Sequence, residues 1–100
     1  MKKEDILSSC TGFEWDIHNT EKIRVKHHVA PVECEQAFFN LPLIVGGDEK
    51  HSQYENHFYT LGQTDAGRLL FLVFTIRRNK LRIISARDMN RKEKRIYKSS

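Results

Sequence analysis

The longest run of apolar positions lies in the C-terminal half of the chain, over residues 69–76. A strand that is apolar at nearly every position is typical of one covered on both faces, so we expect it to be central in a sheet. Arg78-Asn79 follows and fits a two-residue hairpin loop, with residues 80–87 returning as the partner strand. If the pairing runs without interruption from the loop, Arg77 and Arg87 fall on opposite faces of the hairpin.

The N-terminal half of the chain predicts two helices. Asp16 stands where an N-cap belongs, and the helix that it starts should run to about His27, with Ile23 as its inward anchor. Pro31 suits the first position of a second helix. Residues 40–42, Asn-Leu-Pro, should end that helix because the residue before a proline resists the helical region.

Shorter signals complete the chain. Three further short strands are expected at residues 13–15, 43–45 and 58–63, with a loop at residues 46–55. Asn90 and Glu93 form a capping box that starts a last, basic helix, with Ile96 and Tyr97 as its inward contacts. The predicted order is strand, two helices, four antiparallel strands and helix, which is one α+β domain with a small antiparallel sheet. We expect residues 1–11 to be loosely ordered.

Charge is distributed unevenly along the 100 residues. Residues 68–98 hold 11 of the 17 lysines and arginines but only 2 of the 13 acidic residues, so the net charge of +4 combines a basic end with an acidic remainder. Such a basic end favours a polyanion or an acidic protein as partner.

No pattern in the chain indicates a membrane segment or a bound cofactor. No apolar run approaches the roughly 20 residues that span a bilayer, and the start lacks the apolar region of a signal peptide. We therefore expect a cytoplasmic protein without membrane association, with Cys10 and Cys34 as free thiols. The histidines and cysteines match no ligand spacing, so we expect no metal. Gly46-Gly47 has no helix after it and is not a phosphate-binding loop.

What remains is a set of cations with a few side chains that can move protons. RNA can be cleaved this way without metal: a base takes the proton of a 2′-hydroxyl, the oxygen attacks the adjacent phosphate, cations stabilise the crowded phosphorus centre, and an acid protonates the leaving oxygen. Because guanidinium matches phosphate bidentately, the candidate phosphate ligands are Arg68, Arg77, Arg82 and Arg87. The candidate proton carriers are Lys26, His27, His51, Glu55 and Tyr97. Binding of nucleic acid without cleavage fits the same charge pattern.

Several motifs occur in an order that resembles one family. They are Phe13-x-Trp15-Asp16, Lys26-His27, Asp48-x-x-His51-Ser52-x-x-Glu55, Gly67-Arg68, residues 82–87 (Arg-Ile-Ile-Ser-Ala-Arg) and Arg91-x-Glu93-x-x-x-Tyr97. With these motifs, over about residues 13–97, the chain resembles the BrnT family, the toxin half of a bacterial type II toxin–antitoxin system. Two positions depart from the family pattern. His28 stands where Gly is usual, and His57 stands where a basic residue is usual.

The resemblance implies a RelE-like fold and a ribonuclease that arrests translation. It also implies a BrnA-like antitoxin as partner, which binds operator DNA and, with the toxin, represses its own operon. The substrate would be RNA, free or on the ribosome. Two other interpretations remain open, namely a non-catalytic antitoxin-binding co-repressor and a basic RNA-binding domain.

Site residues follow from carrying the resemblance onto this sequence. The positions assigned to catalysis are Lys26, His27, Arg77, Arg87 and Tyr97. Within this set, we expect Arg77 and Arg87 to hold phosphate and Lys26 or His27 to transfer a proton. Tyr97 would act on the attacking or the leaving oxygen. The positions that we assign to RNA contact are Lys22, Arg68, Lys80, Arg82 and Arg91.

Overall fold

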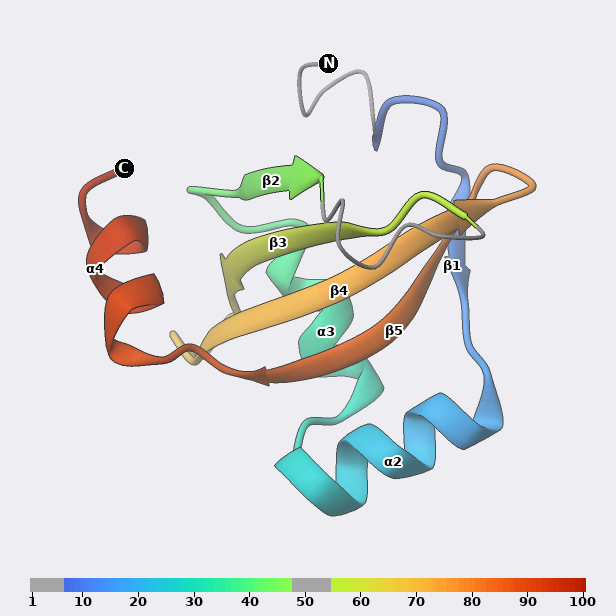
Figure 1. Ribbon diagram of the computed structural model, residues 1–100, viewed down its shortest axis with the longest axis horizontal. Helices are drawn as coiled ribbons and strands as arrows, with labels where there is room; N and C mark the ends of the chain where they lie inside the picture. The colour runs from blue at the N-terminus through green and yellow to red at the C-terminus, as the bar shows by residue number, and fades with distance from the viewer. Residues whose placement is uncertain (1–6, 48–54) are drawn as a thin grey trace.

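A computed structural model of the protein describes residues 7–47 and 55–100 (Figure 1). The candidate His51 and most of the predicted loop at residues 46–55 lie outside these ranges. Within them, no helix is long and apolar enough to cross a membrane. Cys10 and Cys34 are free thiols, as expected.

Five strands form one sheet, in the order β1-β5-β4-β3-β2. The strands are β1 (Gly12–Glu14), β2 (Ile44–Gly47), β3 (Phe58–Gln63), β4 (Leu69–Arg77) and β5 (Lys80–Asp88). The helices are α2 (Ile17–His27), α3 (Pro31–Ala37) and α4 (Arg91–Lys98). The predicted α+β class and order of elements are therefore confirmed. The sheet is mixed, however, because the edge strand β1 runs parallel to β5 whereas the other pairs are antiparallel.

The ends of the helices follow from local sequence. The Asp16 carboxylate accepts hydrogen bonds from the backbone N–H of His18 and Asn19, which confirms it as the N-cap of α2. The same helix ends at His28, which has a left-handed backbone with φ of 55°. Pro31 begins α3, as predicted. The capping box of α4 is present, with Asn90 as its N-cap.

The β4–β5 hairpin has the predicted loop but not the predicted register throughout. Arg78 and Asn79 both have positive φ, 52° and 63°, as the two-residue turn requires. The expected pairing holds from the loop to Phe74 and Ile83, after which Val73 pairs with Ser85. One extra residue in β5 therefore forms a β-bulge at position 84.

The bulge reverses the relation between the two arginines. Arg77 pairs with Lys80, and Arg87 pairs with Phe71, which lies an even number of residues from Arg77 on β4. Alternate residues of a strand share a face, so Arg77 and Arg87 lie on the same face of the sheet. The prediction that they point to opposite faces was wrong, because it assumed an uninterrupted ladder.

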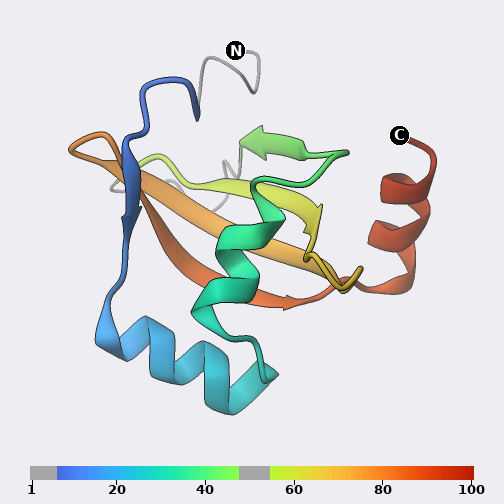
Figure 2. The same ribbon diagram turned by 180° about the vertical axis from the view of Figure 1, so that it is seen from behind.

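The two faces of the sheet are covered unequally. The first face carries Leu70, Leu72, Phe74, Leu81, Ile83 and Ala86, and it packs against Ile23, Val29, Cys34 and Ala37 from α2, α3 and the segment between them. Figure 2 shows α3 in front of the sheet and α2 along its lower edge, next to β5. The second face has a smaller cluster of Leu61, Met89 and Tyr97, where α4 meets the sheet. Leu7 and Cys10 also pack against the main core.

Helix α4 meets the sheet along a narrow stripe. Tyr97 is buried as predicted, and Glu93, one turn earlier, is partly buried. Ile96 is 47% exposed, so its predicted inward position was wrong. Residues four apart occupy one side of a helix, and the pair Glu93 and Tyr97 takes the side that faces the sheet.

The left-handed position at the end of α2 yields a first prediction. Gly adopts positive φ without the steric cost that a Cβ brings, so His28→Gly should raise the free energy of unfolding by about 0.5–1 kcal/mol. Val25→Gly, at an exposed interior position of the same helix, should lower it by a similar amount. Urea unfolding of both variants checks the prediction, and equal signs for the two changes would contradict it.

Candidate functional site

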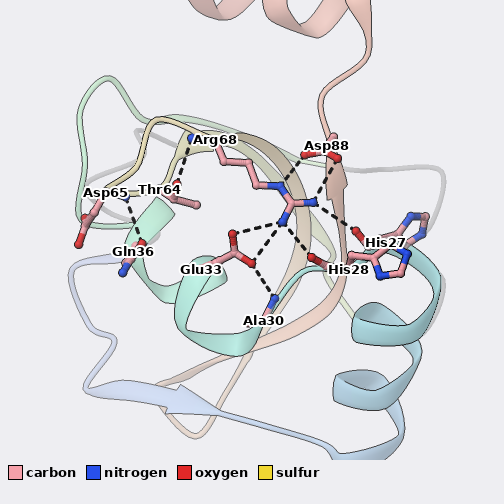
Figure 3. Close-up of polar contacts among 9 residues, drawn as sticks. All are labelled: His27, His28, Ala30, Glu33, Gln36, Thr64, Asp65, Arg68 and Asp88. Carbon is pink, nitrogen blue, oxygen red and sulfur yellow. Dashed lines mark hydrogen bonds and ion pairs between the residues drawn. The ribbon is translucent and has the colours of Figure 1, made fainter.

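A single guanidinium joins four elements of the fold (Figure 3). Arg68 immediately precedes β4. Its Nε and Nη2 donate to the two carboxylate oxygens of Asp88 at 2.7 and 3.1 Å. Its Nη1 donates to the Glu33 carboxylate at 3.2 Å and to the carbonyl of His28 at 2.9 Å. Its Nη2 also donates to the carbonyl of His27 at 3.3 Å. We call this arrangement the Arg68 clamp.

The clamp uses the whole hydrogen-bonding capacity of the side chain. A guanidinium has five N–H donors, and the contacts to Asp88, Glu33 and the two carbonyls engage all of them. The hydrogen bond from Arg68 holds the pKa of Asp88 below its ordinary value. Arg68 was predicted to contact RNA, and in this structure it has no free donor for a phosphate.

Arg82 also forms ion pairs within the fold. Its Nη1 donates to Glu14 at 2.9 Å and its Nη2 to Asp16 at 2.7 Å. Glu14 lies on β1 and Asp16 caps α2, so Arg82 fastens the start of the chain to the sheet. Backbone N–H groups at the helix start, followed by the charge of Arg82, hold the pKa of Asp16 below its ordinary value.

Arg77 forms a bidentate pair with Glu55 at the loop end of the hairpin. The two bonds measure 2.8 and 3.0 Å, and the side chain of Arg77 is 48% exposed. The pair lowers the pKa of Glu55 and raises that of Arg77. Glu55 was a candidate proton carrier, and its carboxylate is instead engaged by Arg77.

Arg87 forms a second bidentate pair near the other end of the same face. It donates to both oxygens of Glu93 at 2.8 and 2.9 Å. Its guanidinium carbon also lies 4.2 Å above the centre of the Phe71 ring, a cation–π geometry. Burial raises the pKa of Glu93, but hydrogen bonds from Arg87 and from the backbone of Asn90 outweigh it, and the pKa is lowered. Arg87 thereby joins α4 to β5.

The predicted site residues therefore divide into two groups. The four arginines Arg68, Arg77, Arg82 and Arg87 are all held by carboxylates. The predicted cations that form no ion pair with another described residue are Lys22, Lys26, Lys80 and Arg91. The expected positive end is thus a row of ion pairs with exposed lysines and arginines beside it.

His27 lies at the end of β5 rather than on the face that holds Arg77. It occupies the last turn of α2, where its carbonyl accepts from Arg68 (Figure 3). Its charge, like that of Lys94 on α4, helps to lower the pKa of Asp88. The end of β5 thus gathers His27, Arg68, Asp88 and the neighbouring Arg87, whereas Arg77 stands at the far end of the sheet.

Tyr97 has a structural contact. Its hydroxyl donates to the carbonyl of Pro42 at 2.7 Å. The side chain is 4% exposed, and this burial raises the pKa of the phenol. The contact ties α4 to the segment before β2.

Several residues of this surface were not identified from the sequence. Phe71, which belongs to the apolar run of residues 69–76, supports Arg87, and the ring of Tyr59 stacks on it with 6.0 Å between centroids. Glu93 was identified as a cap, and it also holds Arg87. Phe71 stands between Leu70 and Leu72, which face the core. Because side chains alternate along a strand, this position indicates that Phe71 lies on the opposite face. Among residues 7–47 and 55–100, no three His, Cys, Asp or Glu side chains are arranged to hold a metal ion.

Comparison with known proteins identifies one family. Residues 15–93 match the model of a family described as the ribonuclease toxin, BrnT, of type II toxin–antitoxin systems. The match includes Lys26, His27, Arg77 and Arg87 and ends before Tyr97. A comparison with curated proteins gives no match.

The Arg68 clamp yields a second prediction. Arg68→Ala leaves two carboxylates and two carbonyls without their donor, so the free energy of unfolding at pH 7 should fall by about 2–3 kcal/mol. Arg24→Ala removes an exposed pair with Glu21 and should cost less than about 0.5 kcal/mol. Urea unfolding measures both.

The loss of free energy of unfolding in Arg68→Ala should depend on pH. Because Arg68 lowers the pKa of Asp88 in the folded state, that pair stabilises the fold above the unfolded pKa of about 3.9. The stabilisation is lost as the pH falls through the lower, folded value. The difference between the wild type and Arg68→Ala should therefore narrow between pH 5 and about pH 2. A difference that stays constant over this range would contradict the role given to Asp88.

Proposed function

The chain belongs to the BrnT family of ribonuclease toxins of type II toxin–antitoxin systems, and from this premise we propose that it is a metal-independent endoribonuclease. One observation carries the proposal. The bulge at position 84 sets Arg77, Lys80, Arg82 and Arg87 on a single face of the sheet, the face that α2 and α3 do not cover. A strand of RNA laid along this face meets a cation at each end of β4.

The spacing of the cations favours a strand over a single phosphate. Arg77 and the partner of Arg87, Phe71, lie six residues apart on β4, which corresponds to about 20 Å. One phosphate cannot contact both arginines. The two ends of the face would instead bind different phosphates of one extended strand, so that cleavage falls inside the RNA and not at its end.

The carboxylate partners prepare the arginines for this role. Glu55 and Glu93 each accept two parallel hydrogen bonds from one edge of a guanidinium, which is also how a phosphate binds it. Both arginines remain partly exposed, at 48% and 34%. An incoming phosphate can bind the guanidinium together with the carboxylate or in its place. Because the carboxylate already orders the arginine side chain, no further ordering is needed when the phosphate binds.

Proton transfer is assigned to the end of β5. There the Arg68 clamp fixes the backbone of His27, which follows Lys26 in the sequence, and it holds Asp88, which follows Arg87 on β5. Imidazole is the side chain most often used to move protons near neutral pH. We propose that His27 or Lys26 acts on the 2′-hydroxyl or the leaving oxygen, while Arg87 stabilises the phosphate charge. Tyr97, whose hydroxyl is bound to Pro42, positions α4 and thereby Glu93.

We further propose a BrnA-like antitoxin as the partner. A toxin of a type II system has a protein antitoxin, and an acidic segment that covers the cationic face would exclude RNA by occupying the same arginines. Operator DNA would be contacted by the antitoxin. The alternative, a non-catalytic co-repressor, is favoured by the ion pairs that already occupy the four arginines, and growth experiments separate the two.

Cleavage tests the enzyme part of the proposal. Arg87→Gln should reduce the rate of RNA cleavage about 10²- to 10³-fold, the usual loss when one donor to a developing anion is removed. The wild-type rate should be unchanged in EDTA. Arg24→Gln makes the same change of charge on α2, at an exposed residue outside the proposed face, and should keep full activity. Gel analysis of a defined single-stranded RNA, with and without ribosomes, measures the rates. Loss of activity in EDTA would overturn metal independence.

Induction in cells tests the toxin–antitoxin part. Expression of the wild type should arrest growth, and expression of Arg87→Gln should not. Co-expression with the DNA-binding protein encoded in the neighbouring reading frame should restore growth, and the two proteins should elute as one complex. Continued growth of wild-type cells together with a tight complex would support the co-repressor and contradict the ribonuclease.

A further inference from the structure

A cleft of about 390 Å³ lies between α4 and the strands of the second face, next to the stripe along which they pack. Tyr59 of β3 and Phe71 of β4 form part of its floor, and Lys92 and Ile96 of α4 line its opposite side. Ile96 is 47% exposed although it is apolar. The cleft thus combines an aromatic floor, an apolar side, the cation of Lys92 and the carboxylate of Glu93, which Arg87 holds.

The ring of Tyr59 lies flat on the neighbouring strand because of a glycine. Gly46 of β2 pairs directly with Tyr59. A Cβ on Gly46 would stand 2.5 Å from the Cε1 atom of the Tyr59 ring and 2.6 Å from its Oη. The ring therefore occupies the space that any other side chain at position 46 would fill. Tyr59 also lines the cleft, and we call the part of its ring that is open there its outer side.

The neighbouring ring is already covered. Phe71 lies nearly parallel to Tyr59, at 15° between ring planes, and the guanidinium of Arg87 stands 4.2 Å above it. A flat ligand that enters the cleft consequently finds the outer side of Tyr59 and not that of Phe71. The same ligand would lie next to the guanidinium that we assign to phosphate.

We propose that the outer side of Tyr59 is a stacking platform for one nucleobase of the RNA, with Ile96 against the edge of the base. Lys92 and Arg87 flank the platform and match the phosphates on either side of that base. The inference rests on the proposed ribonuclease function and adds a base-binding position to it. Because every base has a flat face, the platform accepts different bases and places the strand without reading its sequence.

Binding of an uncleavable RNA tests the platform apart from catalysis. The probe is a short single-stranded oligonucleotide with 2′-O-methyl groups, which lacks the attacking hydroxyl, and fluorescence anisotropy gives its Kd. Tyr59→Leu should weaken binding about tenfold or more, as the loss of one aromatic–base stack does. Tyr59→Phe keeps the ring and should bind within about twofold of the wild type.

Two glycines of β2 supply a matched pair of variants. Gly46→Ala forces the Tyr59 ring off the strand and should weaken binding although Tyr59 itself is intact. Gly47→Ala makes the identical change at the next residue, where an added Cβ meets nothing within 4 Å, and should bind as the wild type does. Thermal unfolding of each variant shows whether it is folded. If Gly46→Ala does not fold, the comparison of Tyr59→Leu with Tyr59→Phe decides whether the ring of Tyr59 binds the probe.

The outcomes separate the platform from the enzyme. Tyr59→Leu that binds the probe as tightly as the wild type overturns the platform, whatever the cleavage assay shows. The platform is also overturned if the wild type does not bind the probe. It is overturned as well if Tyr59→Leu weakens binding of the antitoxin but not of the probe. Wild-type protein that binds the probe through Tyr59 but cleaves no RNA would support the platform and overturn the proposed ribonuclease.

Discussion

The five hydrogen bond donors of Arg68 hold the fold together at the place where its elements change direction. The chain leaves α2 through the left-handed His28, and the two carbonyls exposed there are taken by this guanidinium. The same group binds Glu33 at the start of α3 and Asp88 at the end of β5. The position of His27 relative to the sheet depends on this contact, and so does the arrangement of any chemistry at the end of β5.

Pairing of charges extends this principle across the molecule. Arg77, Arg82 and Arg87 each face carboxylates from a different element, so the arginines order loops, caps and a helix before any ligand arrives. Charged groups held in this way are preorganised for an anion that matches the same geometry. The basic part of the sequence thus forms a surface on which carboxylates hold the arginines in place.

The β-bulge shows where reasoning from the hairpin sequence stops. The loop Arg78-Asn79 and the first pairs were predicted correctly, since positive φ at both positions is a local property. The shift between Val73 and Phe74 was not predicted. Ile84 and Ser85 are both partly buried. Their burial therefore does not distinguish the uninterrupted register from the bulged one. Packing of Ala86 into the core rather than Ser85 selects the register, and it carries Arg87 to the face of Arg77.

The sequence alone determined the elements, their caps, the hairpin loop, the central strand and the resemblance to the BrnT family, because each of these signals acts within a few neighbouring residues. Only the tertiary structure decided which carboxylate each arginine meets, since Arg68 and Asp88 are 20 residues apart and Arg82 and Glu14 are 68 apart. It also decided that Gly46 makes room for the ring of Tyr59. Contacts of this kind depend on strand register and on helix packing, which no local pattern encodes.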